Sequence, residues 1–175
     1  MKRHIELFDY ANEILNAVKS GVLLTTQAGG KANTMTISWG TLGIQWGKPV
    51  FITFVRGSRH TKSLLDENPE FTVNIPVGNV DKNILKICGT KSGRDMDKFQ
   101  ELGLIQEAPE KISVPGIRQL PLTLECRVVY KQQQIPQCMQ NSELLTHYPE
   151  NSQNIHDDFH TAYYGEIVST YIIED

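Results

Sequence analysis

Cysteine is scarce in this 175-residue chain, which has only Cys88, Cys126 and Cys138. No two of them share a Cys-x-x-Cys spacing, and an odd number of cysteines does not complete a disulfide framework. We therefore expect three reduced thiols, most of them buried.

Long hydrophobic runs are also missing. No segment approaches 18 consecutive apolar residues, so we expect no transmembrane helix. Lys2 and Arg3 are followed by Glu6 and Asp9 instead of an apolar stretch, so a signal peptide is not expected. These absences predict a cytoplasmic protein without a membrane partner.

An excess of positive charge is absent as well, because 17 Lys and Arg against 20 Asp and Glu give a formal net charge of −3 at pH 7. Bulk nucleic-acid binding needs a basic surface and is therefore not expected. The charge is uneven, however: residues 1–98 hold 13 Lys and Arg against 9 Asp and Glu, and residues 99–175 hold 4 against 11. A site for an anionic ligand is expected in the basic half.

Several motifs that carry known chemistry are missing. The chain has no Gly-x-Gly-x-x-Gly opening a helix, no Walker-type loop, no Gly-x-Ser-x-Gly and no His-Glu-x-x-His. The spacing closest to a metal site joins His156 and His160, four residues apart. That spacing suits a metal only in a helix, and the segment runs into a β-rich stretch, so we expect no metal site.

Length and hydrophobic pattern predict one domain over residues 1–175. It begins with a helix over 6–19, continues as a β-rich barrel over about 21–130 and 159–174, and includes a polar excursion over about 131–158. Strands are predicted over 22–26, 33–39, 50–55, 71–75, 122–130 and 160–173, and short helices over 61–67, 80–87, 96–102 and 142–147. Six to seven strands without strand–helix alternation favour an antiparallel barrel or sandwich with peripheral helices.

The predicted strand over 33–39 is the first candidate site. Alternation places Met35, Ile37 and Trp39 on one face and Thr34, Thr36 and Ser38 on the other. One interpretation is a half-buried strand with a solvated hydroxyl face. The other is a polar strand edge that offers hydroxyls and backbone groups to a planar heterocycle.

The second candidate is the turn from Arg56 to Thr61, where two guanidinium groups and two hydroxyls gather between a strand and a helix. Helix N-termini bind anions, and Arg adds bidentate contacts to phosphate. A basic turn in which Thr61 caps the helix explains the same pattern.

The third candidate is the loop from Lys91 to Lys98, which carries Ser92 and Arg94 and also opens a helix. Its cations suit a phosphate, and Asp95 is expected to cap the helix over 96–102. A capped and solvated loop is the alternative. In chain order, the three candidates suggest a phosphorylated planar cofactor that lies across a barrel.

Together these segments resemble the flavin reductase-like family of FMN-binding split barrels, and within it the flavoredoxin-type branch. The resemblance covers about residues 20–170. It rests on the order of Asn33-Thr34-Met35-Thr36-Ile37-Ser38-Trp39, Gly47-Lys48-Pro49, Arg56-x-Ser58-Arg59-x-Thr61, Phe71-Thr72-Val73-Asn74-Ile75-Pro76, Gly89-Thr90-Lys91-Ser92-Gly93-Arg94-Asp95-x-Asp97-Lys98-Phe99 and His160-Thr161-x-x-x-Gly165-Glu166-Ile167.

The resemblance implies a mainly β fold with peripheral helices: a six-stranded antiparallel split β-barrel that forms a homodimer, with FMN near the subunit interface. It also implies three groups of cofactor-binding residues: Asn33, Thr34, Met35, Thr36, Ile37, Ser38 and Trp39 around the isoalloxazine ring; Arg56, Ser58, Arg59 and Thr61 at the phosphate; and Asn74, Ser92, Gly93 and Lys98 nearby. His160 matches a histidine near the flavin in related reductases. A catalytic role for it and a purely structural one both stay open.

For the activity, the resemblance implies an FMN-dependent oxidoreductase that takes a hydride from NADH or NADPH and reduces free flavin or another acceptor. A non-enzymatic FMN electron carrier that docks with redox partner proteins is the alternative, and an FMN- or haem-binding storage or sensing module is a third. The lack of a nicotinamide fingerprint does not decide between them, because split-barrel reductases bind nicotinamide without one. The excursion over 131–158 departs from the simplest family pattern and would cap the flavin face or the dimer.

Overall fold

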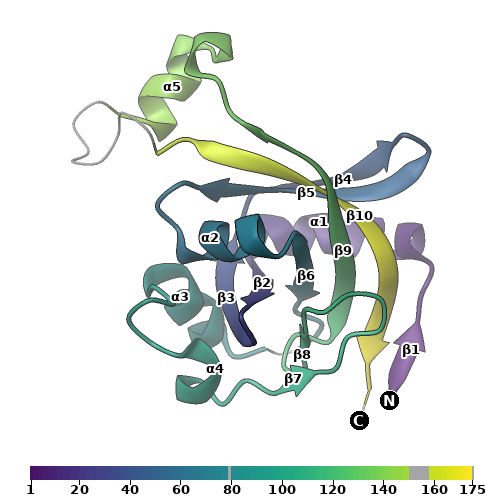
Figure 1. Cartoon of the computed structure of the whole chain (residues 1–175). Coiled ribbons are helices and arrows are strands. Elements are labelled where there is room, and N and C mark those ends of the chain that lie inside the picture. Colours follow the sequence, from purple (N-terminus) through teal and green to yellow (C-terminus); the bar gives the residue numbers. More distant parts are fainter. Residues whose placement is uncertain (79, 150–157, 175) are drawn as a thin grey trace.

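The alternating segments form one curved antiparallel sheet in the computed structural model, which describes residues 1–78, 80–149 and 158–174 (Figure 1). The strands are β1 (Lys2–His4), β2 (Val22–Ala28), β3 (Lys31–Ile37), β4 (Gly40–Gln45), β5 (Lys48–Arg56), β6 (Glu70–Ile75), β7 (Gln106–Glu107), β8 (Gly116–Ile117), β9 (Leu122–Gln133) and β10 (His160–Ile173). The helices are η1 (Leu7–Tyr10), α1 (Ala11–Ser20), α2 (His60–Glu67), α3 (Lys82–Thr90), α4 (Lys98–Glu101), η2 (Pro136–Cys138) and α5 (Asn141–His147).

The main sheet has the strand order β3-β2-β6-β9-β10-β5-β4, and β1 also pairs with β10, so this sheet has eight strands within the described residues. The mainly β antiparallel fold with peripheral helices is confirmed, but the strand count of six is too low. β1 is too short to show a period of two, and β4 was missed because Gly40 and Gly43 interrupt its alternation. β7 and β8 form a separate two-stranded sheet.

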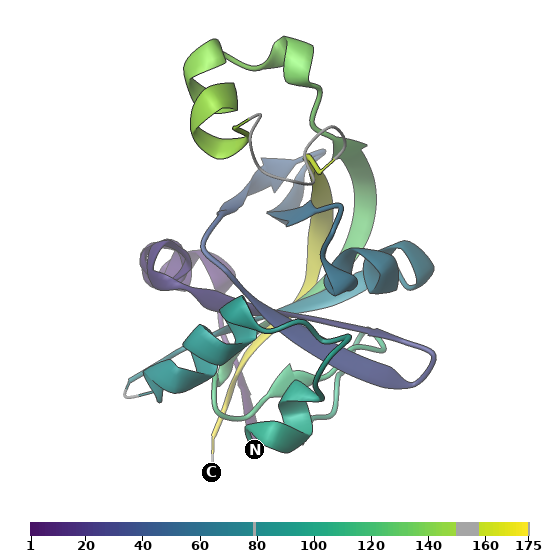
Figure 2. The same cartoon turned by 90° about the vertical axis from the view of Figure 1, so that its left-hand side faces the viewer.

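β10 is the strand around which the sheet bends. Its first half, His160–Glu166, pairs with β5, its last residues pair with β1, and β9 runs beside nearly its whole length. Register shifts at Tyr164/Gly165 and Ile167/Ser169 mark bulges, which bend a strand and increase its twist. The bend separates the end of β9 and the start of β10, next to which α5 lies, from the part of the sheet covered by α3 and α4 (Figures 1 and 2).

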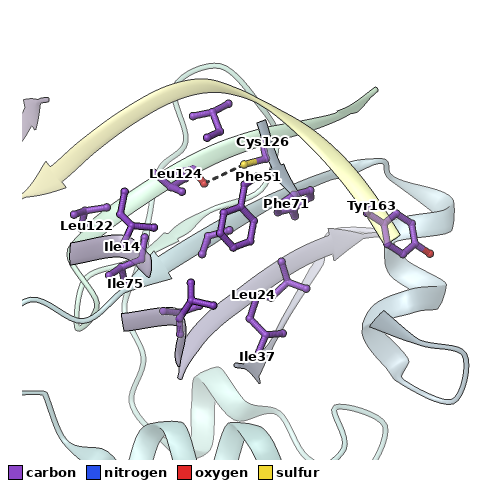
Figure 3. Close-up of a cluster of buried hydrophobic side chains, with 14 of the residues drawn as sticks. Ile14, Leu24, Ile37, Phe51, Phe71, Ile75, Leu122, Leu124, Cys126 and Tyr163 are labelled. Atoms are coloured by element: carbon purple, nitrogen blue, oxygen red, sulfur yellow. Dashed lines mark hydrogen bonds between the residues drawn. The ribbon is translucent and has the colours of Figure 1, made fainter. Parts of the chain in front are cut away.

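The main core lies inside the curve of the sheet, where α1 supplies Ile14 and the strands supply Phe51, Phe71 and Leu124 (Figure 3). A second cluster lies on the other face of β2, under α3 and α4, and includes Leu23 and Phe99. β2 is therefore buried on both faces, as a central strand between two layers must be. This second layer holds the loop before α4 against β3.

Gly165 marks the closest approach in the core. A Cβ at this position would lie 2.4 Å from Cζ of Phe71 and 2.8 Å from Cβ of Cys126. The glycine lets β10 cross the aromatic ring of Phe71 where the first bulge bends the strand.

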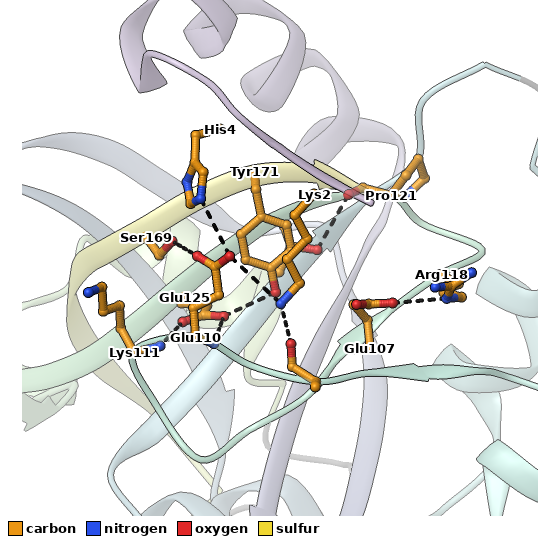
Figure 4. A network of polar contacts seen from close by, with 12 residues as sticks. Lys2, His4, Glu107, Glu110, Lys111, Arg118, Pro121, Glu125, Ser169 and Tyr171 are labelled. Carbon is orange, nitrogen blue, oxygen red and sulfur yellow. Dashed lines mark hydrogen bonds and ion pairs between the residues drawn. The ribbon is translucent and has the colours of Figure 1, made fainter. Parts of the chain in front are cut away.

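A buried carboxylate fastens the segment after β7 to the sheet (Figure 4). Glu125 on β9 is fully buried, and its Oε1 accepts hydrogen bonds from the amide of Glu110 (2.8 Å) and Oη of Tyr171 (3.0 Å). Its Oε2 accepts one from the amide of Lys111 (2.7 Å). These donors compensate the cost of burying the charge.

Several predicted boundaries are corrected by local hydrogen bonding. The helix over 6–19 begins as a 3-10 turn, and its α-helical part is Ala11–Ser20. The helix over 96–102 is only Lys98–Glu101, because Asp97 and not Asp95 caps it: Oδ1 of Asp97 accepts hydrogen bonds from the amides of Phe99 (3.0 Å) and Gln100 (3.1 Å). β9 continues to Gln133, past the predicted start of the polar excursion. None of the described helices has the length and apolar character needed to cross a bilayer.

Candidate functional site

A cleft of about 600 Å³ lies where β3, β5, the loop before α2, the loop before α4 and the start of β10 meet. Its volume is in the range of sites for small molecules and cofactors, roughly 300–1,000 Å³. Fourteen of the sixteen residues expected at the site line it. They are Asn33, Met35, Thr36, Ile37, Ser38, Trp39, Arg56, Ser58, Arg59, Thr61, Ser92, Gly93, Lys98 and His160.

The other two, Thr34 and Asn74, do not line the cleft. Both are fully buried, and each is bonded to Thr25: Oγ1 of Thr25 donates to Oγ1 of Thr34 (3.1 Å) and accepts from Nδ2 of Asn74 (2.9 Å). Oδ1 of Asn74 also accepts a hydrogen bond from the amide of Ile117 (3.0 Å). These side chains join neighbouring strands and are directed into the fold, so we do not place them in the ligand site.

β3 borders the cleft as an edge strand and ends at Ile37, two residues earlier than predicted. The expected division into an apolar and a hydroxyl face does not describe the cleft, because Met35 and Thr36 both line it. Ser38 and Trp39 form the short connection to β4 at the opposite edge of the sheet, and Trp39 is 41% exposed. The cleft therefore lies beside the connection that joins the two edges.

The loop between β5 and α2 supplies the hydroxyl and guanidinium groups. α2 begins at His60 with Arg59 in the N-cap position, so Thr61 is not the cap. Thr61 is buried and accepts a hydrogen bond from Nδ2 of Asn33 (3.1 Å). Nη1 of Arg94 donates to the carbonyl of Ser58 (2.9 Å) and ties the two basic loops together.

The conformation of the second loop depends on Gly93. A Cβ on Gly93 would lie 2.0 Å from Oδ1 of Asn33 and 3.1 Å from Cδ2 of His60. Only a residue without a side chain lets this loop approach β3 and α2 so closely. The glycine therefore sets the width of the cleft at this point.

The cleft is electropositive, because five of its lining residues are Lys or Arg and one, Asp95, is acidic. Nζ of Lys98 is buried and donates to the carbonyls of Thr34 (2.8 Å) and Cys88 (3.1 Å). Burial lowers the pKa of Lys98, and burial together with the charges of Arg94 and Lys98 lowers the pKa of His60. Lys98 thus links β3 to α3 through hydrogen bonds and also places a positive charge in the cleft.

A carboxylate from outside the predicted site residues occupies the first loop. Oδ1 of Asp158 accepts a hydrogen bond from the amide of Ser58 (2.7 Å), and Oδ2 accepts one from Oγ of Ser58 (2.9 Å). Nη1 of Arg56 lies 3.9 Å from Oδ2. The loop therefore binds an anionic group in this structure.

His160 lines the cleft beside Arg56, its partner on β5. It is 7% exposed, and its ring centroid lies 4.8 Å from that of Trp39. Its Nδ1 contacts Oη of Tyr148, which donates to Oε1 of Gln134 (2.7 Å). Burial, and then the charge of Arg56, lower the pKa of His160 to about 4, so the ring is neutral at pH 7. The hydrogen-bond pattern assigns the proton to Nδ1.

Sequence reasoning missed four residues here: Phe54 and Cys88, which line the cleft, and Tyr148 and Asp158, which contact residues that do. Phe54 could have been predicted from the sequence, because it precedes Arg56 by two residues on one strand and therefore shares its face. Tyr148 and Asp158 belong to the polar excursion, where no periodicity indicated which side chains return to the sheet. His156 lies outside the described residues, and within those residues no three His, Cys, Asp or Glu side chains could hold a metal ion.

A family model described as "Flavin reductase like domain" matches residues 15–175. Among curated proteins, an uncharacterized protein of Archaeoglobus fulgidus is 34% identical over 99 residues, which are 57% of this chain and 55% of that protein. The match therefore spans about half the length of that relative.

Solved structures with the same fold include flavoredoxins from Desulfovibrio vulgaris (TM-score 0.65, 20% identity, 88% of this chain and 69% of that one) and Methanosarcina acetivorans (TM-score 0.64, 25% identity, 88% and 68%). Component B of nitrilotriacetate monooxygenase from Bacillus cereus is similar as well (TM-score 0.66, 16% identity, 94% and 77%). These similarities confirm the resemblance stated from the sequence.

Proposed function

The chain belongs to the flavin reductase like domain family, and from this premise we propose that it binds FMN in the cleft and acts as a flavin-dependent oxidoreductase. The observation that carries the proposal is the mixed lining of the cleft. The hydroxyls and cations of the loops around Ser58 and Arg94 line it together with the aromatic rings of Trp39 and His160. FMN likewise combines a phosphate with a planar ring.

The loops around Ser58 and Arg94 fit an anion on two grounds. The amide and hydroxyl of Ser58 already bind a carboxylate, and the same donors suit a phosphate oxygen. Arg59 and Lys91 line the cleft, and neither side chain forms a hydrogen bond or ion pair with another described residue. We propose that Ser58, Arg59 and Thr61 hold the phosphate, with Ser92 and Lys98 nearby.

The apolar and aromatic part of the lining fits an isoalloxazine and includes Met35, Trp39, Phe54 and His160. β3 is an edge strand, so main-chain N–H groups on its outer side have no partner strand. We propose that N–H groups between Thr36 and Trp39 face the ring and stabilise negative charge there. Neutral His160 would contact the ring or the nicotinamide.

When bound, FMN supplies the redox chemistry, which is hydride acceptance from NADH or NADPH and transfer to flavin or another acceptor. The protein's part is to fix the phosphate, orient the ring against Trp39 and keep His160 uncharged beside it. A second candidate function is a non-enzymatic FMN electron carrier, because two of the similar structures are named flavoredoxins.

Anaerobic stopped-flow mixing tests the proposal. Protein saturated with FMN, at one FMN per chain, is mixed with NADH and separately with NADPH while flavin absorbance is followed. Bleaching within seconds by one of them supports the oxidoreductase. No bleaching, with reduction by a reduced ferredoxin-type protein, supports the carrier. A protein that binds no added FMN would refute both.

We also propose that the protein is a cytoplasmic homodimer. Support for the dimer comes from exposed aromatic residues where the β4–β5 turn meets β9 and β10: Trp46 (63% exposed) contacts Tyr130, and Tyr130 contacts Tyr164. Exposed apolar patches of this kind commonly mark interfaces. The three free cysteines support a reducing compartment. Sedimentation equilibrium should give twice the chain mass of 19.8 kDa.

A further inference from the structure

Asp158 stands opposite Ser58 because of the sheet register. His160 pairs with Arg56 in the antiparallel ladder between β10 and β5, so two residues further out the same register places Asp158 beside Ser58. The carboxylate meets the loop with both oxygens, at 2.7 Å from the amide nitrogen and 2.9 Å from Oγ of Ser58. The register of the two strands therefore positions this contact.

A phosphate monoester would need the same two donors. The amide of Ser58 has one hydrogen and its hydroxyl has one, and Asp158 accepts both of them. A phosphate oxygen at either position would meet the carboxylate, which also carries the same sign of charge. The two anions therefore exclude one another at Ser58.

We propose that Asp158 is a specificity-determining residue that competes, from within the chain, with the phosphate of the bound ligand. The proposal rests on the proposed FMN site and adds a selectivity to it. By occupying Ser58, Asp158 weakens binding of a flavin phosphate but not of a flavin without phosphate, such as riboflavin. When phosphate does bind, Asp158 leaves Ser58, and its attraction to Arg56 at 3.9 Å is released at the same time.

The test compares the dissociation constants of FMN and riboflavin for the full chain and for Asp158→Asn, which removes the charge and keeps the size. We expect FMN to bind about tenfold more tightly to the variant, because the neutral side chain holds Ser58 more weakly, in total by about the worth of one charge-assisted hydrogen bond. Riboflavin binding should change by less than about twofold. Asp95→Asn is the matched control, because it removes the one acidic charge that lines the cleft without touching Ser58, so it should shift FMN binding by less than about threefold.

The proposal is overturned if the affinity for FMN, relative to that for riboflavin, is unchanged or lower in Asp158→Asn. Asp158 would then support the loop and not compete for it. An equal gain in FMN affinity in Asp95→Asn overturns the proposal too, because it would show that removing any nearby negative charge strengthens FMN binding.

Inorganic phosphate, followed through the Ser58 amide resonance, separates this result from the proposed function. If no variant binds either flavin, the flavin function fails. About tenfold tighter phosphate binding in Asp158→Asn would then still support the competition, and equal phosphate binding would refute it.

Discussion

Arg59→Ala is the sharpest test of where the phosphate of FMN binds. Arg59 occupies the N-cap position of α2 and lines the cleft, and its guanidinium forms no hydrogen bond or ion pair with the other described residues. Removing it should therefore leave the free energy of unfolding within about 0.5 kcal/mol of the wild-type value. Any loss of affinity can then be assigned to the ligand and not to the fold.

The size of the loss follows from the interaction that is removed. A hydrogen bond between guanidinium and phosphate is worth about 1.5–3 kcal/mol, and each 1.4 kcal/mol is a factor of ten in the dissociation constant. FMN should thus bind about 10- to 100-fold more weakly to Arg59→Ala. Riboflavin lacks the phosphate and should lose less than about threefold.

Quenching of flavin fluorescence measures both dissociation constants at one fixed salt concentration, since screening changes the phosphate contribution. Arg118→Ala is the matched control, because Arg118 pairs with Glu107 (2.9 Å) and does not line the cleft. Equal losses for FMN and riboflavin would refute the reasoning. So would a loss of FMN binding in the control as large as that in Arg59→Ala.

Three further substitutions test the geometry of the site and the core. Gly93→Ala puts a Cβ 2.0 Å from Oδ1 of Asn33, so it should displace the loop and weaken FMN binding about tenfold, measured by the same titration. Gly165→Ala overlaps with the ring of Phe71 at 2.4 Å and should lower the free energy of unfolding by about 1–3 kcal/mol in urea; an unchanged midpoint would contradict the packing described. Burial holds the folded-state pKa of His160 at about 4, below its unfolded value of about 6.5, so the unfolded chain binds more protons between these pH values and stability falls as pH drops through that window. Between pH 7 and pH 4, the free energy of unfolding should fall by about 2–3 kcal/mol less in His160→Gln than in the wild type. Identical pH profiles of unfolding free energy for the two proteins would show that His160 is not the buried neutral group.

The sequence predicted which segments come together better than it predicted the residues that support them. Residues of the three motifs meet in one cleft because β3, the β5–α2 loop and the loop before α4 follow one another around the sheet. Thr34 and Asn74 are polar residues of the kind that bind ligands, but both form hydrogen bonds with Thr25 inside the fold. A side chain's partner across the sheet depends on strand order, which period-two patterns do not reveal.

The parts that the sequence did not predict have a common physical origin. β4 has glycines where a strand pattern needs side chains. Asp95 was predicted as the cap in place of Asp97 because the sequence alone does not distinguish two acids separated by one residue. Asp158 acquires its role from the pairing of β10 with β5, which joins segments about a hundred residues apart. Local patterns cannot specify such contacts.

The central position of β10 has a consequence for the order in which the molecule assembles during synthesis. The segment β2-β3-β6-β9 and the hairpin β4–β5 are both made before β10, yet only β10 joins them in the sheet. Before β10 emerges from the ribosome, β9 and β5 each present an unpaired edge, which is the kind of edge that recruits chaperones or other nascent chains. Since His160 begins β10, the ligand cleft is completed in the same step that removes this exposure.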